Sequence, residues 1–306
     1  MMNTRKISLF LLLTFGISWL SAGILYLAGV AYGSRLSGIC TAILFMGAPA
    51  TAAIIVQKFI YKQPIKEMGL KLREAKGWAF LRIPLIYLLI CLSWIGTIAL
   101  FGNVFHINGF GRMTFDDAEV LANINEVTKA LGGPALSKLP FPAEALLIMQ
   151  IVSSFLAGAI VNTIFTLGEE LGWRGFLYNE MQALGFWKSN LLIGITWGFW
   201  HAPIILQGHN YPDHRAAGIL IMVLFCIPLG YVMAYVRRRT NSVLAPAILH
   251  AGINAIGGNL ALYSTGSMDI IGGIAGASGA IACAVVLVLV IIIDRKTLLT
   301  KPYLAQ

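Results

Sequence analysis

Two adjacent glutamates at the end of a long apolar run are the first residues that could carry out chemistry. They stand in the sequence GEELGWRG, in which Glu170 and Arg174 are four residues apart. If the helix of the apolar run continues, these two side chains share one face and can form an ion pair. Glu169 is rotated by about 100° from that face. We therefore expect Glu170 and Arg174 to form a structural pair and Glu169 to be the free carboxylate.

Two histidines and an asparagine follow in later apolar runs. His201 ends the sequence WGFWH and lies about 20 Å along a helix from Lys188, which places it inside the apolar zone. Trp197 is one turn earlier on the same face and can form the wall of a pocket. His250 and Asn254 are four residues apart, so both point the same way. Because an ionisable side chain inside a span is costly, these residues are candidates for function.

Together, these side chains could activate water for attack on an amide carbonyl. Burial disfavours the charged form of Glu169, which makes it a suitable general base for water. His201 could bind the same water and share its proton. His250 and Asn254 offer hydrogen-bond donors on one face, which suits an oxyanion hole. The sequence contains no serine-elbow motif that would indicate a nucleophilic serine.

Other functions are open to the same residues. Two histidines and one glutamate form a complete catalytic zinc set, although the helical His-Glu-x-x-His motif is absent. Intramembrane histidines and glutamates also relay protons or ions in transporters, which often contain repeats that this sequence lacks. The polar side chains could instead join helices by hydrogen bonds in a non-catalytic scaffold or immunity protein. We keep the non-catalytic protein and a zinc-dependent membrane protease as alternatives.

The composition indicates that the chain is folded in a lipid bilayer. The chain has 306 residues, of which 58% are hydrophobic and 11% charged, and its mean hydropathy is +0.79. A soluble domain usually carries about 25% charged residues. The net charge of +9 does not indicate nucleic-acid binding, because the basic residues stand in short loops between apolar runs. We expect one membrane domain over residues 1–306, with residues 145–262 as its motif-bearing part.

Eight apolar runs of about 20 residues predict an all-α, polytopic membrane protein. The runs lack the period-two alternation of a β-barrel, the other structure that can span a bilayer. The predicted spans are residues 7–29, 37–57, 79–101, 145–168, 189–206, 217–236, 243–262 and 273–293. We expect Pro203 to bend the fifth span just beyond His201.

The lysines and arginines of the loops predict the orientation of the chain. With the N-terminus in the cytoplasm, 17 of the 22 basic residues fall on the inner side, which is the side that such residues favour. We therefore predict a protein of the plasma (inner) membrane with both termini in the cytoplasm. The longest loop, residues 102–144, then lies outside, and its segment 116–131 has the apolar spacing of a surface helix.

The remaining polar residues and the cysteines have simpler interpretations. His209 is expected to be solvated in a short outer loop, and Glu180 and Asp269 to be loop charges. The run Arg237–Arg239 is interpreted as an orientation signal. The cysteines lie inside apolar runs without paired metal-ligand spacing, so we expect neither disulfides nor a zinc framework. They are Cys40, Cys91, Cys226 and Cys283.

The three motifs, taken in order, resemble those of the CAAX-protease and bacteriocin-processing (CPBP) family of intramembrane endopeptidases, also called the abortive-infection family. The motifs are Glu169-Glu170-x-x-x-Arg174, Trp197-x-x-x-His201 and His250-x-x-x-Asn254. The resemblance in order and spacing covers roughly residues 145–262. One such motif is a weak signal, whereas three in order are specific. The family's fold, eight helices with the motifs on the fourth, fifth and seventh, is similar to the span count above.

The resemblance implies a glutamate-dependent and metal-independent peptidase that needs no cofactor. Glu169 and His201 would activate water, and His250 and Asn254 would stabilise the oxyanion. The ion pair of the first motif would support the site. The tryptophan of the second motif stands where the family often has phenylalanine, a difference that bears on the shape of the pocket.

The resemblance also suggests what kinds of molecule the protein meets. Eukaryotic members of the family remove the C-terminal tripeptide from prenylated proteins. The short basic loops of this chain look bacterial, and a bacterial member would process a peptide, act in bacteriocin self-immunity or control a membrane regulator. The expected partners are a peptide or membrane-protein substrate and the lipid bilayer, with no nucleic acid.

Overall fold

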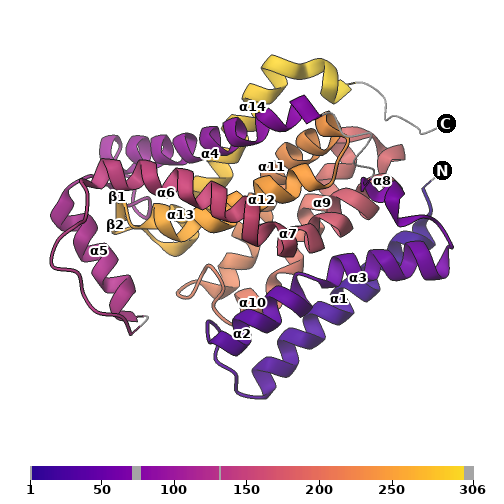
Figure 1. The fold of residues 1–306 in the computed structure, drawn as a ribbon, viewed down its shortest axis with the longest axis horizontal. Helices are drawn as coiled ribbons and strands as arrows, with labels where there is room; N and C mark the ends of the chain where they lie inside the picture. Colours follow the sequence, from indigo (N-terminus) through magenta and orange to yellow (C-terminus); the bar gives the residue numbers. More distant parts are fainter. Residues whose placement is uncertain (1, 71–76, 131, 300–306) are drawn as a thin grey trace.

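The fold consists mainly of long helices (Figure 1). The computed structural model describes residues 2–70, 77–130 and 132–299, and most of them are helical. Among these residues the strands form one antiparallel pair, in which β1 (Arg112–Met113) lies beside β2 (Ser264–Thr265). The predicted all-α class is therefore confirmed.

Eight helical stretches occupy the positions of the eight predicted spans. The first four are α1 (Thr4–Leu27); α2 (Arg35–Cys40) with η1 (Thr41–Phe45), α3 (Ala48–Ile54) and η2 (Ile55–Ile60); η5 (Gly77–Leu81) with α4 (Arg82–Ile98) and η6 (Ala99–Val104); and α6 (Ala143–Ala157) with η7 (Gly158–Asn162), α7 (Thr163–Glu170), η8 (Leu171–Leu177) and α8 (Tyr178–Glu180). The last four are α9 (Gly185–Trp200) with α10 (Ala202–Ile205); α11 (Arg215–Thr240); α12 (Leu244–Ala261); and α13 (Asp269–Gly272) with α14 (Ala277–Leu299). The shorter elements between them are η3 (Ile65–Met68), α5 (Asp117–Ala130) and η9 (Gln182–Leu184).

Six of these stretches are long and apolar enough to cross a membrane by length and composition. The other two contain α9 and α12, which are 16 and 18 residues long. Both carry predicted site residues, and the polar side chains of the third motif lower the hydropathy of α12. The structure thus supports a polytopic membrane protein, for which eight is an approximate number of spans.

The fourth stretch is longer than the sequence predicted. We expected a span that ends at residue 168, but one helical stretch runs from Ala143 to Glu180. It continues past Glu170 through the π-helical turn η8, in which the wider turn still places Arg174 next to Glu170. Glu169 therefore lies inside this stretch, about three turns before its end, and not at a helix terminus.

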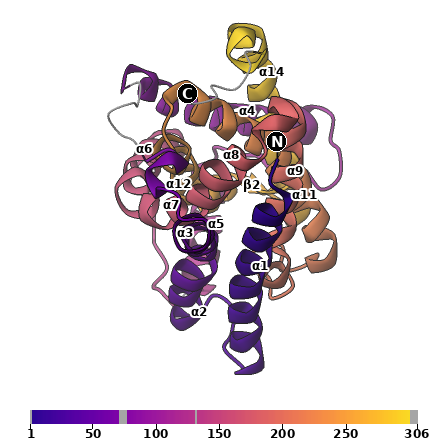
Figure 2. The same ribbon diagram turned by 90° about the vertical axis from the view of Figure 1, so that its right-hand side faces the viewer.

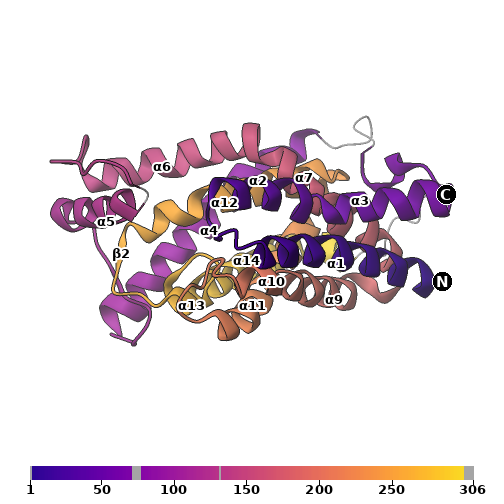
Figure 3. The same ribbon diagram turned by 90° about the horizontal axis from the view of Figure 1, so that it is seen from below.

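The helix α12 lies in the middle of the bundle. It packs against α6 and α7 on one side and against α11 on another, while α11 also packs against α9 and α14. Figure 3 shows α12 between α6 and α11. The first two helical stretches pack against each other, through α1 with α3 and η1, and α3 also packs against α7 and η8. Figure 2 shows α1 and α3 side by side. The three motifs therefore meet at the centre of the fold, on α7, α9 and α12.

Charged contacts join the helix ends that the sequence placed in the cytoplasm. Lys6, at the start of α1, forms an ion pair with Glu180, with 2.5 Å between Nζ and Oε1. Arg239, at the end of α11, lies 3.1 Å from the carboxylate of Asp294 in α14. These ends lie together on the right of Figure 1, in agreement with helices that alternate in direction, while their cytoplasmic position stays a prediction. Four of the basic residues that were counted as inner charges lie outside the described residues: Lys71, Arg73, Lys76 and Lys301.

The predicted surface helix in the long loop is present as α5. It is mostly exposed, and Val120 is its buried side chain among the described residues. Asp117 at its start accepts a hydrogen bond from the backbone N–H of Ala143 at 2.8 Å. Asn123 donates to the carbonyl of Leu262 at 2.8 Å. These contacts attach α5 to the first turn of α6 and to the end of α12.

Glycines let α9 approach α11 closely. A Cβ atom at Gly198 would lie 2.5 Å from the Cα of Val223, and one at Gly194 would lie 2.8 Å from the Cα of Ile227. Small residues at such positions are typical of close helix contacts in membranes. The close approach fixes the position of α9, and with it the positions of Trp197 and His201.

Candidate active site

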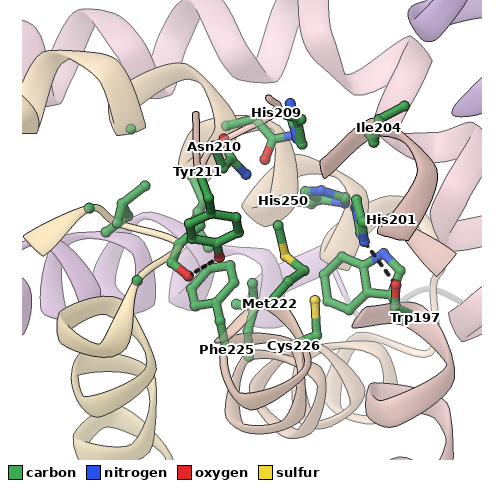
Figure 4. A pocket seen from close by; sticks show the side chains of 18 of the residues that line it. Trp197, His201, Ile204, His209, Asn210, Tyr211, Met222, Phe225, Cys226 and His250 are labelled. Carbon is green, nitrogen blue, oxygen red and sulfur yellow. Dashed lines mark hydrogen bonds between the residues drawn. The ribbon is translucent and has the colours of Figure 1, made fainter. Parts of the chain in front are cut away.

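One cavity collects the four residues that the sequence predicted to be catalytic. It has a volume of about 420 Å³, and its walls include Glu169, His201, His250 and Asn254. These residues come from α7, from the junction between α9 and α10, and from α12. Figure 4 shows His201 and His250 facing the same space as the indole of Trp197. The structure therefore brings together the four residues that were predicted to be catalytic, and their chemical roles stay predictions.

The two adjacent glutamates have different partners. The carboxylate of Glu170 forms the expected ion pair with Arg174, with 2.9 Å between Oε1 and Nη1, and both residues are fully buried. The guanidinium of Arg174 also stacks over the ring of Trp197, with 4.2 Å between Cζ and the ring centroid. Glu169 instead accepts a hydrogen bond from the indole N–H of Trp197 at 2.9 Å. The predicted ion pair of Glu170 with Arg174 is thus present, whereas the hydrogen-bond partner of Glu169 is a neutral indole.

A hydrogen bond to the backbone determines which ring nitrogen of His201 carries the proton. Nδ1 lies 2.8 Å from the carbonyl oxygen of Trp197, one turn earlier. A carbonyl oxygen can only accept a hydrogen bond, so Nδ1 must carry the proton. In the neutral ring Nε2 therefore has a free lone pair, which can accept a hydrogen bond from water. The helix is interrupted at His201: α9 ends at Trp200, and α10 begins at Ala202 with Pro203 in its first turn, where the sequence predicted a bend.

The ring of His250 is held by the second glutamate. Its Nδ1 lies 3.1 Å from Oε1 of Glu170, the oxygen that also pairs with Arg174. An ionised carboxylate only accepts hydrogen bonds, so this contact places a proton on Nδ1. The ring contacts the indole of Trp197 edge-on, with 5.3 Å between centroids. His250 can therefore donate a hydrogen bond from Nε2 only when the ring carries two protons.

Asn254 is on the same face of α12 as His250, and both line the cavity. His250 is buried at 4% exposure, whereas Asn254 is exposed. The shared face that the four-residue spacing predicted is therefore confirmed. The cavity thus changes from a buried polar floor at Glu169 and His250 to a more open region at Asn254.

His209 is a cavity residue that the sequence analysis missed. We expected it to be solvated, but it lines the same cavity as Glu169 and His201. The chain turns back here because Gly208 and Asn210 both have positive φ values, of 104° and 59°. His209 is part of this turn, so no helical spacing connects it to the motifs. The sequence signal that could have indicated the turn is the glycine and asparagine on either side of the histidine.

Three other polar residues have partners that the sequence analysis did not predict. Glu180 is the partner of Lys6 and ends α8, so it is not in a loop. Asp269 accepts hydrogen bonds from the backbone N–H of Asp213 and from the ring of His214, and it lines the cavity. Arg237 is buried at 6% exposure. Its Nε donates to the carbonyl of Arg174 at 3.1 Å, so it supports the helix that carries the first motif.

Neither a disulfide nor a cluster of metal ligands is found in the part of the chain that the structure describes. The four cysteines have free thiols. The same residues contain no group of three or more histidine, cysteine, aspartate or glutamate side chains placed to hold a metal ion. In addition, Nδ1 of both His201 and His250 is taken by a protein acceptor. A zinc site would have to use the Nε2 atoms of these rings together with Glu169.

Comparison with known proteins indicates the same family that the motifs resemble. Residues 145–256 match the family model described as type II CAAX prenyl endopeptidase Rce1-like. This segment is therefore similar to the Rce1-like endopeptidases, and we call residues 145–256 the Rce1-like segment. The predicted resemblance to the CAAX-protease family is thereby confirmed. The Rce1-like segment includes every predicted site residue, from Glu169 to Asn254, and also His209.

A curated relative agrees with this result. The chain is 29% identical over 92 residues to CAAX prenyl protease 2 of Methanococcus maripaludis. The similarity covers 28% of this chain and 34% of the relative, so the chain matches about a third of the relative's length. The first 144 residues lie outside the Rce1-like segment.

Proposed function

We propose that the protein is an intramembrane endopeptidase that hydrolyses a peptide bond with water activated by Glu169 and His201. One observation carries the proposal: Glu169, His201 and His250 line a single cavity, and all three belong to the Rce1-like segment. Glu169 is 2% exposed, so its carboxylate is held away from bulk water. Its neighbour Glu170 already takes the nearby cation, which leaves Glu169 available for chemistry.

The geometry is suited to water activation. Trp197 donates to Oε2 of Glu169 and so fixes the carboxylate in one orientation. A water molecule between Glu169 and Nε2 of His201 would donate one hydrogen bond to each of these acceptors. As the water oxygen attacks the carbonyl carbon, Glu169 takes its proton. The protonated Glu169 then gives that proton to the leaving amine nitrogen when the C–N bond breaks.

The oxyanion of the tetrahedral intermediate would be stabilised by His250 and Asn254. The side-chain amide of Asn254 is a neutral donor on the open side of the cavity. His250 donates from Nε2 in its doubly protonated form, because its Nδ1 proton is held by Glu170. Preorganised donors of this kind commonly lower a barrier by about 3–4 kcal/mol each.

The substrate would be a peptide or a membrane protein that reaches the cavity from the bilayer. The relative's name refers to a CAAX prenyl protease, and we propose CAAX-prenyl-protease-like endopeptidase activity for this chain. Away from its polar floor the cavity has apolar walls, which favour an apolar substrate segment. These walls include Phe45, Met222, Phe225, Leu229 and Ile253. We also propose that the protein lies in the plasma membrane with both termini in the cytoplasm, as the loop charges predict.

The test is cleavage of a fluorogenic peptide library by the purified protein in detergent. Wild-type protein is compared with Glu169→Gln, with and without a chelator. Cleavage that persists in chelator and disappears in the variant would support the proposal. Loss of cleavage in chelator, with recovery on adding zinc, would assign the same residues to a zinc protease. If a well-folded wild-type protein cleaves no peptide, the non-catalytic scaffold or immunity protein becomes the better explanation.

A further inference from the structure

His209 is placed next to the proposed water-activating residue by a contact from another part of the chain. Its ring lies parallel to that of His201, with 6.4 Å between centroids and 5° between planes. Its Nδ1 lies 2.5 Å from the hydroxyl of Tyr32. Tyr32 stands in the turn between α1 and α2, whereas His209 stands in the turn after α10. Two turns from distant parts of the chain thus meet beside the cavity that both histidines line.

The contact with Tyr32 decides which ring nitrogen of His209 carries the proton. Burial lowers the pKa of His209 to about 4, so the ring is neutral near pH 7. Burial also raises the pKa of Tyr32 to about 12, so its hydroxyl keeps its proton. A phenol is a better donor than a neutral imidazole N–H, and an imidazole nitrogen is a better acceptor than a phenol oxygen. The hydroxyl therefore donates to Nδ1, and Nε2 carries the ring proton.

This assignment makes His209 different from the other two histidines of the cavity. In their neutral forms, His201 and His250 have their Nδ1 protons directed to the protein and their lone pairs on Nε2. A neutral His201 ring cannot then donate a hydrogen bond into the cavity, and His250 donates there only in the doubly protonated form that the proposed mechanism uses. His209 lies outside the motifs. When all three rings are neutral, it is the one whose Nε2 carries a proton and can donate a hydrogen bond. A peptide that enters the cavity offers carbonyl oxygens, which require such a donor.

We propose that the Nε2–H of His209 donates a hydrogen bond to a carbonyl oxygen of the bound peptide, and that Tyr32 positions it by fixing the ring tautomer. The nature of the ligand rests on the proposed function, whereas the tautomer does not. His209 thereby contacts substrate, and Tyr32 acts through His209. Because the bond forms to the substrate in the ground state and in the transition state alike, it contributes to KM and not to kcat.

The kinetic test compares His209→Ala with His209→Gln on a peptide that the wild-type protein cleaves. The Gln amide nitrogen can replace the Nε2–H donor, whereas Ala has none. We expect His209→Ala to raise KM by about 2- to 10-fold with kcat unchanged, as for the loss of one neutral hydrogen bond, and His209→Gln to restore most of the affinity. Tyr32→Phe should raise KM in the same direction. His106→Gln is the matched control, because this exposed histidine does not line the cavity. An unchanged KM in His209→Ala would overturn the proposal.

A second measurement separates this proposal from the proposed function. The ring nitrogens of ¹⁵N-histidine-labelled protein are observed by NMR in detergent, in the Glu169→Gln background in which no hydrolysis is expected. The signals of His209 are identified by their loss in His209→Gln. We expect the Nε2–H tautomer, and a shift toward a mixture of tautomers in Tyr32→Phe. An Nδ1–H tautomer or a doubly protonated ring at pH 7 would overturn the proposal, whatever the outcome of the peptide assays.

Discussion

Glu169 and Glu170 are neighbours in the chain, but their carboxylates have separate partners. Glu170 pairs with Arg174 at 2.9 Å and holds the ring of His250 at 3.1 Å. Glu169 accepts one hydrogen bond from Trp197 at 2.9 Å and faces the cavity. The two residues are almost equally buried, at 2% and 0% exposure. The same substitution at the two positions should therefore have different consequences, one for catalysis and one for stability.

The first prediction concerns Glu169→Gln. Glutamine has nearly the same volume, and its amide oxygen can still accept the hydrogen bond from Trp197, so the fold should be retained. Glutamine cannot take a proton from water, and loss of a general base typically slows a reaction by about 10²- to 10⁴-fold. The measurement is kcat/KM on a cleaved peptide, together with the thermal unfolding midpoint in detergent. A variant that retains wild-type kcat/KM would exclude Glu169 as the base.

The second prediction concerns Glu170→Gln, the matched variant. It leaves the guanidinium of Arg174 buried without its negative partner. Removing one member of a buried ion pair typically costs about 3–5 kcal/mol. We expect a clear fall in the thermal unfolding midpoint, in contrast with Glu169→Gln measured in the same detergent. Equal midpoints for the two variants would show that the pair has no such structural role.

The third prediction concerns Trp197→Phe. The change keeps an aromatic ring under Arg174 and removes the indole N–H that orients Glu169. A hydrogen bond to a charged group contributes about 1.5–3 kcal/mol, and part of this should be lost in the transition state. We expect kcat to fall by about tenfold or more, with a smaller change in stability than in Glu170→Gln. Steady-state kinetics of the purified variant give the result, and an unchanged kcat would argue against an orienting role for the indole.

The fourth prediction concerns the close contact between α9 and α11. A Cβ at Gly198 would lie 2.5 Å from the Cα of Val223, so Gly198→Ala must displace backbone. Overpacking of this kind typically costs about 1–3 kcal/mol. Gly96→Ala is the control, because a Cβ there meets nothing within 4 Å. We expect thermal unfolding at a lower temperature for Gly198→Ala and not for Gly96→Ala; a stable Gly198→Ala protein would contradict the packing argument.

The fifth prediction concerns metal dependence. In the proposed mechanism, Glu169 and Nε2 of His201 activate water directly, without a metal ion. We expect prolonged dialysis against a chelator to leave kcat/KM unchanged. Metal analysis of the dialysed protein is the control that shows removal of metal. Activity that is lost on dialysis and recovers with zinc would replace the glutamate mechanism by a zinc mechanism.

The sequence determined the fold class and which residues make up the three motifs. Runs of apolar residues predict helices in a bilayer because an unsatisfied backbone polar group is costly in hydrocarbon. Four-residue spacings predicted that Glu170 meets Arg174 and that His250 and Asn254 share a face, because these relations depend on the geometry of a single helix. The end of the fourth helical stretch was predicted 12 residues too early, at 168 instead of Glu180. Polar motif residues interrupt the apolar pattern without ending the helix.

Only the tertiary structure decided which partners meet across the bundle. The bond from Trp197 to Glu169 and the contact of His250 with Glu170 depend on how α7, α9 and α12 cross, and no local spacing encodes a crossing. His209 was missed because it reaches the cavity from a turn, where it meets Tyr32 from a distant part of the chain. Local periodicity thus fixes the face on which a side chain lies, whereas close helix packing and the path of the turns fix what that side chain contacts.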